Sequence, residues 1–196
     1  MRKLIVCNIA SLDGYFEGPG KDVMALPFDE AFDAYNAERL RAADTWLLGR
    51  TSFEGFKSYW PPLADDPDVG AVEREISQLN NAIDKVVVSD SLTPEQLAPW
   101  NNTRIVKRSD AHEQIAELKR QPGEEILVLG SHTLWNDLLV AGLVDEVHLM
   151  IGPALLGAGT PVFEGETPVS LELLDARILD GSALVLARYG MAGSAG

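Results

Sequence analysis

The chain has 196 residues, 46% hydrophobic and 23% charged, which is enough apolar material for one well-filled globular core. Its formal net charge of -14 disfavours nucleic acid or an anionic membrane as the main partner, because both need clustered lysines and arginines. No apolar run approaches the roughly 20 residues that cross a bilayer, and the single cysteine, Cys7, allows no internal disulfide, so we expect a cytoplasmic protein.

Strand and helix patterns alternate through the first two thirds of the chain. Residues 3–10 predict a buried strand, and residues 27–43 carry apolar side chains at the spacing of an amphipathic helix. A second strand at 45–49 leads into a helix at 51–59, where Thr51 and Glu54 fit the capping-box pattern. The same reasoning predicts helices at 71–81, 109–120 and 131–141, and strands at 85–89, 103–107, 125–129 and 146–151.

The C-terminal third has a different pattern. Residues 171–179 and 183–189 read as strands that flank Asp180-Gly181, a strong hairpin signal. We therefore expect one three-layer α/β domain over residues 1–190, with a mixed, mostly parallel sheet, a C-terminal antiparallel hairpin, helices on both faces and a flexible tail at 191–196. The apolar strands of the hairpin invite burial, so we expect a homodimer.

Two segments place small polar residues between a strand end and a helix start. They are Leu48-Gly49-Arg50-Thr51-Ser52 and Leu129-Gly130-Ser131-His132-Thr133-Leu134. A helix N-terminus offers unpaired N–H groups and a partial positive charge, and Arg50 adds a guanidinium that suits phosphate oxygens. Each segment is a candidate phosphate site, although plain capping by Thr51 and Ser131 explains either segment taken alone.

Other common chemistries have no visible motif. The sequence contains neither G-x-G-x-x-G after its first strand nor G-x-x-x-x-G-K-[ST], which disfavours a standard Rossmann domain and a P-loop enzyme. His112, His132 and His148 have no i, i+4 partner, so we expect no metal site. A G-x-S-x-G nucleophile elbow is also missing, which disfavours acyl hydrolysis.

Six segments match one family in order and spacing. They are Ser11-Leu12-Asp13-Gly14-Tyr15, Leu48-Gly49-Arg50-Thr51-Ser52-Phe53, Val88-Ser89, Leu129-Gly130-Ser131, Gly142-Leu143-Val144-Asp145-Glu146, and Leu156-Gly157-Ala158-Gly159-Thr160-Pro161. Together they resemble the RibD C-terminal-domain group of the dihydrofolate reductase superfamily, across nearly the whole chain. The resemblance implies a dihydrofolate reductase-like fold and an NADPH-dependent oxidoreductase.

The resemblance also implies roles at the cofactor end. The residues that would hold the phosphates are Gly49, Arg50, Thr51 and Ser52, and those that would cover the pyrophosphate are Gly130, Ser131, His132, Thr133 and Leu134. Ser89 would lie near the adenosine, and Ala10 and Leu12 would flank the nicotinamide. The chain departs from the family at Leu129, where Gly-Gly is frequent, and at His132, where dihydrofolate reductases commonly carry arginine. Arg50 would select a 2′-phosphate, assisted by Lys107 or Arg108.

The substrate end is defined by two carboxylates and several aromatic residues. Asp13 follows the first strand, and Asp33 resembles in position the pterin-binding carboxylate of dihydrofolate reductases; both are candidate catalytic groups. A solvated acid explains Asp13 equally well and is the favoured interpretation of Asp33. Phe53, Phe56, Tyr59 and Trp60 could form a wall for a flat substrate that Tyr15 closes over, although core packing is the more common role of such residues.

Together with these features, the resemblance implies hydride transfer from NADPH to a C=N or C=O bond of a small pterin-like or pyrimidine-like heterocycle. The resemblance implies an activity similar to 5-amino-6-(5-phosphoribosylamino)uracil reductase or to dihydrofolate reductase. The first of these substrates carries a phosphate, and few cationic contacts for it are visible. A non-catalytic NADP(H)-binding protein that retains the fold is the alternative.

Overall fold

An eight-stranded sheet forms the centre of the molecule, whose computed structural model describes residues 1–165 and 168–192. Its strand order is β5-β4-β3-β6-β1-β7-β10-β9. The strands are β1 (Leu4–Ser11), β3 (Ala43–Gly49), β4 (Asp84–Val88), β5 (Thr103–Val106), β6 (Glu125–Leu129), β7 (Glu146–Gly152), β9 (Leu171–Ile178) and β10 (Val185–Met191). The first six in this order run parallel, and β10 is antiparallel to both β7 and β9, which confirms the mixed sheet with a C-terminal hairpin.

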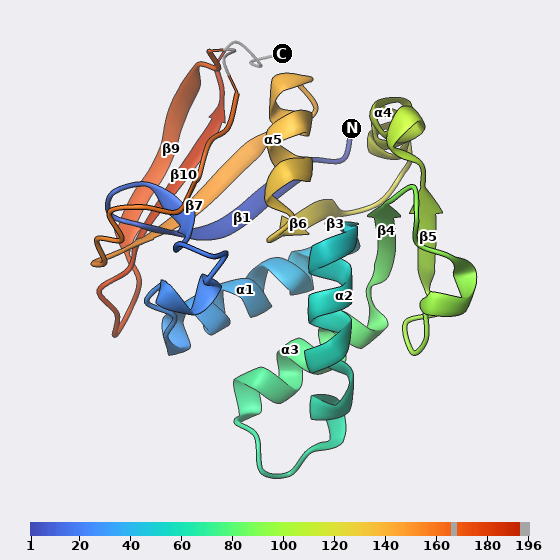
Figure 1. Cartoon of the computed structure of the whole chain (residues 1–196), viewed down its shortest axis with the longest axis horizontal. Coiled ribbons are helices and arrows are strands. Elements are labelled where there is room, and N and C mark those ends of the chain that lie inside the picture. Colours follow the sequence, from blue (N-terminus) through green and yellow to red (C-terminus); the bar gives the residue numbers. More distant parts are fainter. Residues whose placement is uncertain (166–167, 193–196) are drawn as a thin grey trace.

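Helices cover both faces of this sheet, as Figure 1 shows. The helices are α1 (Glu30–Ala42), α2 (Arg50–Tyr59) and α3 (Ala71–Ala82) on one face, and α4 (Ala111–Arg120) and α5 (His132–Val140) on the other. Successive strand side chains point to opposite faces, so Cys7 and Ile9 pack toward Tyr35 of α1, while Leu4 and Val6 pack in the cluster of α4 and α5. The three-layer prediction is confirmed.

Several short elements were not predicted. A two-stranded sheet pairs β2 (Tyr15–Glu17) with β8 (Thr160–Pro161), and it ties the loop after β1 to the loop after β7. The short 3-10 helices are η1 (Val23–Ala25), η2 (Pro61–Asp65), η3 (Pro94–Gln96) and η4 (Arg108–Asp110). Within the described ranges, no helix is long and apolar enough to cross a membrane.

Two predicted helix starts are wrong. The capping box at Thr51 does not form, because α2 begins at Arg50 with Gly49 as its N-cap and no side chain caps it. The helix predicted to begin at Ser109 begins at Ala111 instead, since Ser109 lies in η4 and its hydroxyl donates to Asp110. At the C-terminus, Met191 ends β10, and the rest of the predicted tail, residues 193–196, lies outside the described residues.

The aromatic core under α2 makes a prediction about stability. Phe53 is fully buried and its ring centroid lies 5.9 Å from that of Trp100. Phe53→Ala should lower the free energy of unfolding by about 3–5 kcal/mol, because apolar burial is lost and a cavity remains. Urea denaturation measures this, with Leu155→Ala as control, since Leu155 is 74% exposed and should change stability by less than about 0.5 kcal/mol. Equal losses in the two variants would contradict the packing described.

Candidate functional site

Two helix starts meet at the carboxyl ends of β3 and β6, which are parallel neighbours in the sheet. Ser131 joins them: its Oγ accepts the N–H of Gly49 at 3.0 Å, and its own N–H donates to Ser52 Oγ at 2.7 Å. The two segments expected to hold phosphates therefore form one continuous surface.

The turn between β6 and α5 has an unusual backbone. Gly130 and Ser131 both lie in the left-handed region, with φ of 61° and 53°. A Cβ at Gly130 would come within 3.1 Å of Ser52 Oγ, so glycine permits the close approach of the two segments. The Gly130 N–H donates to Asn8 Oδ1 at 2.8 Å, which anchors the turn to β1. Left-handed geometry is costly at serine, and these hydrogen bonds hold it in place.

The N–H groups that remain for a ligand are those of the first turns. Neither α2 nor α5 has a side-chain cap, and the first N–H groups of any α-helix have no partner within the helix. At α2 these groups belong to Arg50, Thr51 and Ser52. At α5 they belong to His132, Thr133 and Leu134. Two adjacent, uncapped helix N-termini favour an anion through their N–H groups and their dipoles.

Cationic side chains lie beside this surface at the ends of β4 and β5. The guanidinium of Arg50 donates to Glu54 at 2.9 Å and to Ser91 Oγ. Lys107 Nζ donates to the carbonyl of Asp90 at 3.0 Å, and Arg108 Nε lies 3.8 Å from the Asp90 carboxylate. Three cationic side chains are thus gathered beside the helix starts of a chain of net charge -14, with Glu54 and Asp90 as their acidic neighbours.

Some residues expected at the cofactor end have other contacts. Ser89 is buried, and its hydroxyl accepts the N–H groups of Ser91 and Leu92, so it shapes the loop after β4. The ring of His132 bonds to the carbonyls of Pro161 and Val162, which leaves its backbone N–H for a ligand.

The two residues expected to flank the nicotinamide differ in exposure. Ala10 is buried in the core between the sheet and α5, whereas Leu12 is 65% exposed. The N–H of Leu12 donates to the carbonyl of Ala154. Leu12 therefore offers its side chain at the surface, while Ala10 does not.

Asp13 holds two loops together. Its carboxylate accepts hydrogen bonds from Ser11 Oγ at 2.7 Å and from the N–H groups of Gly157 and Leu156 at 2.7 and 3.1 Å. These bonds, that of Ser11 first, lower the pKa of Asp13. A carboxylate held in its ionised form is suited to positioning the loop rather than to donating a proton.

Asp33 has the opposite environment. It lies in the first turn of α1, and no hydrogen bond or ion pair reaches its carboxylate from residues 1–165 or 168–192. Burial, followed by the nearby charges of Glu73, Asp29 and Glu30, raises the pKa of Asp33 to about 6. Such a carboxyl group can hold a proton near neutral pH.

The aromatic residues divide into core and surface. The substrate role expected of Phe53 is wrong, because its side chain is fully buried and its ring packs near that of Trp100. Trp46 belongs to the same core cluster. Tyr59 is 51% exposed, lies edge-on to the half-buried Trp60 with ring centroids 5.0 Å apart, and donates to Glu73 at 3.0 Å. The hydroxyl of Tyr15 contacts the carbonyl of Gly157 at 3.4 Å. These three remain accessible to a ligand.

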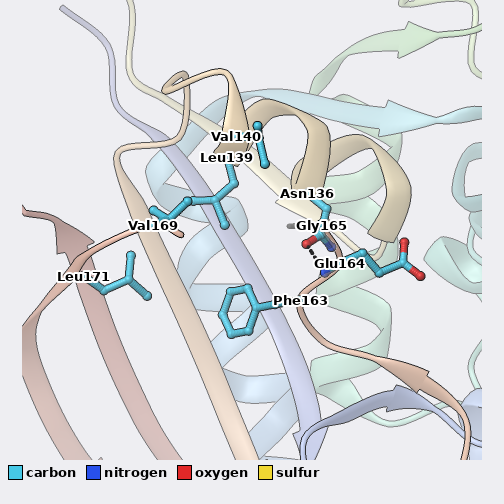
Figure 2. Close-up of a pocket in the computed structure, with 8 residues that line it drawn as sticks. All are labelled: Asn136, Leu139, Val140, Phe163, Glu164, Gly165, Val169 and Leu171. Atoms are coloured by element: carbon cyan, nitrogen blue, oxygen red, sulfur yellow. Dashed lines mark hydrogen bonds between the residues drawn. The ribbon is translucent and has the colours of Figure 1, made fainter. Parts of the chain in front are cut away.

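A separate cleft of about 240 Å³ lies between α5, the segment after β8 and β9, as Figure 2 shows. It is lined by Asn136, Leu139, Val140, Phe163, Glu164, Gly165, Val169 and Leu171. Asn136 accepts the N–H of Glu164 there, and none of the described residues that line the cleft is a lysine or arginine. It does not suit a dinucleotide, so the candidate site remains at the helix starts.

No group of three or more metal-ligating side chains occurs among the described residues.

Sequence reasoning missed Asn8, Ser91 and Glu73. Asn8 left a signal, since it is a polar residue within the otherwise apolar strand β1, and it is 5% exposed. Ser91 and Glu73 left none, because exposed serines and glutamates are common in any loop or helix.

Comparisons with known proteins place the chain in a family. The family model of the RibD C-terminal domain matches residues 2–185. The chain belongs to the RibD C-terminal domain family. It is 31% identical over 177 residues to the uncharacterized protein YyaP of Bacillus subtilis (strain 168), covering 90% of this chain and 88% of that protein.

Solved structures share the fold of this RibD C-terminal domain. A pyrimidine reductase-like protein from Corynebacterium diphtheriae is similar with a TM-score of 0.66 and 16% identity, over 97% of this chain and 92% of that chain. Dihydrofolate reductase from Enterococcus faecalis, solved with NADP(H), is similar with a TM-score of 0.61 and 17% identity, over 97% and 96%. At these identities the comparison shows the fold alone, and the predicted dihydrofolate reductase-like fold is confirmed.

The raised pKa of Asp33 predicts a stability effect in this RibD C-terminal domain. A carboxyl whose pKa is higher in the folded than in the unfolded state loses folding stability as pH rises from about 4 to about 6. Asp33→Asn should therefore be more stable than the wild type at pH 7, and the difference should vanish below about pH 4, where both side chains are neutral. Thermal unfolding at several pH values measures it. A constant difference at all pH values would contradict the burial of this charge.

Proposed function

We propose that this RibD C-terminal domain protein is an NADPH-dependent reductase, which transfers hydride to a C=N or C=O bond of a small pterin-like or pyrimidine-like heterocycle. The carrying observation is the meeting of two uncapped helix starts through Ser131, with Arg50 beside them. The likeness to a dihydrofolate reductase solved with NADP(H) and to a pyrimidine reductase-like protein supports the proposal.

The residues present fit the nucleotide. A pyrophosphate would be held by the free N–H groups at the starts of α2 and α5, which the close approach at Gly130 brings together. Arg50, with Lys107 and Arg108 across the loop after β4, would hold a 2′-phosphate. Bound NADPH supplies the hydride, and the chain supplies orientation and a proton.

The proton is assigned to Asp33. The transferred hydride leaves a nitrogen or oxygen that must gain a proton, and a carboxyl with a pKa of about 6 can provide one. Asp13 stays ionised and positions the loop between β1 and β2, which carries Leu12 and leads into Tyr15. Tyr59 and Trp60 present an aromatic surface for a flat substrate.

Cofactor selectivity tests the nucleotide end. Arg50→Ala should weaken NADPH binding by about tenfold or more and leave NADH binding nearly unchanged, because one charge-assisted contact to the 2′-phosphate is lost. Calorimetry on both cofactors measures it, and Arg41→Ala, which removes an exposed ion pair with Glu75, is the control. Equal weakening of both cofactors would remove Arg50 from the 2′-phosphate. A ligand at 100 times its Kd should add about 2.7 kcal/mol to the free energy of unfolding. If neither NADPH nor NADH raises the unfolding midpoint, the proposal is overturned.

Turnover tests the substrate end. The assay follows NADPH oxidation in the presence of each member of a panel of pterins, pyrimidines and quinones. With any compound that is reduced, the rate should fall as pH rises through about 6, because Asp33 loses its proton. Asp33→Asn should reduce kcat by about 10²–10⁴-fold and abolish this pH dependence. Asp13→Asn should instead lower thermal stability and retain the pH dependence. Cofactor binding without turnover on any substrate would indicate a non-catalytic NADP(H)-binding protein.

A further inference from the structure

One face of α3 holds the end of α2. Three polar side chains, spaced four residues apart, lie in a row along this helix: Glu73, Ser77 and Asn81. Ser77 is fully buried, and its Oγ donates to the carbonyl of Trp60 at 2.6 Å. Asn81 Nδ2 donates to the carbonyl of Pro61 at 3.3 Å. The backbone at the point where α2 ends is therefore fixed by α3, next to the aromatic pair Tyr59 and Trp60.

Glu73, the first member of this row, binds a side chain instead. The hydroxyl of Tyr59 donates to Glu73 Oε1 at 3.0 Å, and the ring of Tyr59 packs edge-on to that of Trp60. An ionised carboxylate has no proton to donate, so the phenol is the donor in this bond. Burial, followed by this hydrogen bond, raises the pKa of Tyr59. The phenol therefore keeps its proton, and the proton is directed at Glu73.

The direction of this hydrogen bond determines what Tyr59 can offer a ligand. Tyr59 is half-exposed, so its oxygen is accessible from solvent. A hydroxyl has one proton and two lone pairs, and the proton of Tyr59 is already used. A ligand group that meets this oxygen must therefore donate a hydrogen bond, as an amino group does and a carbonyl does not. Without Glu73 the hydroxyl could rotate and serve either kind of group.

The charges around Tyr59 have the same preference. The charges of Glu73 and Asp33 act on Tyr59, and those of Glu73, Asp29 and Glu30 act on Asp33. All of these groups are acids. Hydrogen-bond donors are favoured beside negative charge, whereas a phosphate or another anion is repelled. The place where α1, α2 and α3 meet therefore suits a ligand edge that is rich in N–H groups.

We propose that Glu73 is a positioning residue, which fixes the Tyr59 hydroxyl as a hydrogen-bond acceptor and so selects an amino-substituted heterocycle over its oxo analogue. This inference rests on the proposed function, because it takes Tyr59 as part of the substrate surface. Glu73 acts through Tyr59. An amino group of the substrate gives the Tyr59 oxygen a donor, whereas an oxo group in its place would bring two acceptors together and leave both unpaired.

The contact is tested first in the protein without ligand. NMR of the tyrosine ring carbon that bears the hydroxyl measures the pKa of Tyr59, whose signal is assigned by its loss in Tyr59→Phe. Glu73→Ala should lower this pKa, because the hydrogen bond and the negative charge that raise it are removed. Glu75→Ala is the matched control, since it removes an acid of α3 that pairs with Arg41, and it should leave the pKa unchanged.

Selectivity is tested by binding to the NADPH-loaded protein. Calorimetry gives the Kd of 2,4-diaminopyrimidine and of uracil, its oxo analogue, and the wild type should prefer the diamine. The ratio of the two Kd values should move toward uracil by about two- to tenfold in Glu73→Ala and in Tyr59→Phe, the effect of one hydrogen bond. The double variant should change the ratio no further than Tyr59→Phe alone, because the two residues act as a unit.

The outcomes separate this inference from the proposed function. A Tyr59 pKa that Glu73→Ala does not lower, an unchanged ratio, additive effects in the double variant, or an equal effect of Glu75→Ala would each overturn the role of Glu73 and leave the reductase proposal standing. Binding of neither pyrimidine would overturn it as well. Failure of NADPH to bind would instead overturn the proposed function, whatever the NMR result. Unchanged circular dichroism confirms that the variants fold.

Discussion

The hydrogen bonds of Ser131 are the constraint on which the candidate site depends. Parallel strands β3 and β6 bring two helix starts to the same edge of the sheet, but adjacency alone leaves their separation unspecified. Ser131 sets it, because its Oγ binds Gly49 and its N–H binds Ser52. The left-handed backbone at Gly130 and Ser131 directs Ser131 toward these two partners, and the hydrogen bond from the Gly130 N–H to Asn8 Oδ1 holds the turn in place. Two helix N-termini are thus held together at one surface.

The sequence was sufficient for the layers of this fold because the hydrophobic pattern determines them. The largely apolar run at residues 4–10, interrupted by Asn8, is typical of a strand covered on both faces, and Asp180-Gly181 indicated the hairpin turn. Local rules failed where a long-range contact decided the outcome. Thr51 fits a capping box, yet α2 begins one residue earlier because Gly49 is bound to Ser131, 82 positions away. Phe53 looked like a substrate contact, but its direction from α2 toward Trp100 depends on tertiary packing.

The carboxylates show the same limit in electrostatic terms. Asp13 and Asp33 are both candidates in the sequence, with Asp13 the better supported, and their environments in the structure separate them. Hydrogen bonds from Ser11, Gly157 and Leu156 stabilise the charged form of Asp13, whereas burial and neighbouring acids destabilise the charged form of Asp33. The pairs of segments responsible are distant in sequence, since the loop after β7 supplies two donors to Asp13 and α3 supplies Glu73. A pattern of residue types cannot contain this information, although it can name both candidates.

The order of the strands also separates the two ends of the molecule. From β9 the sheet has four steps to β6 and five to β3, each of about 4.8 Å, so the two helix starts lie roughly 19 and 24 Å from the outer edge. The antiparallel strand β10 lies between β7 and β9 and contributes none of the residues of the candidate site described above. The parallel part of the sheet therefore carries the candidate site, and the C-terminal hairpin lies apart from it.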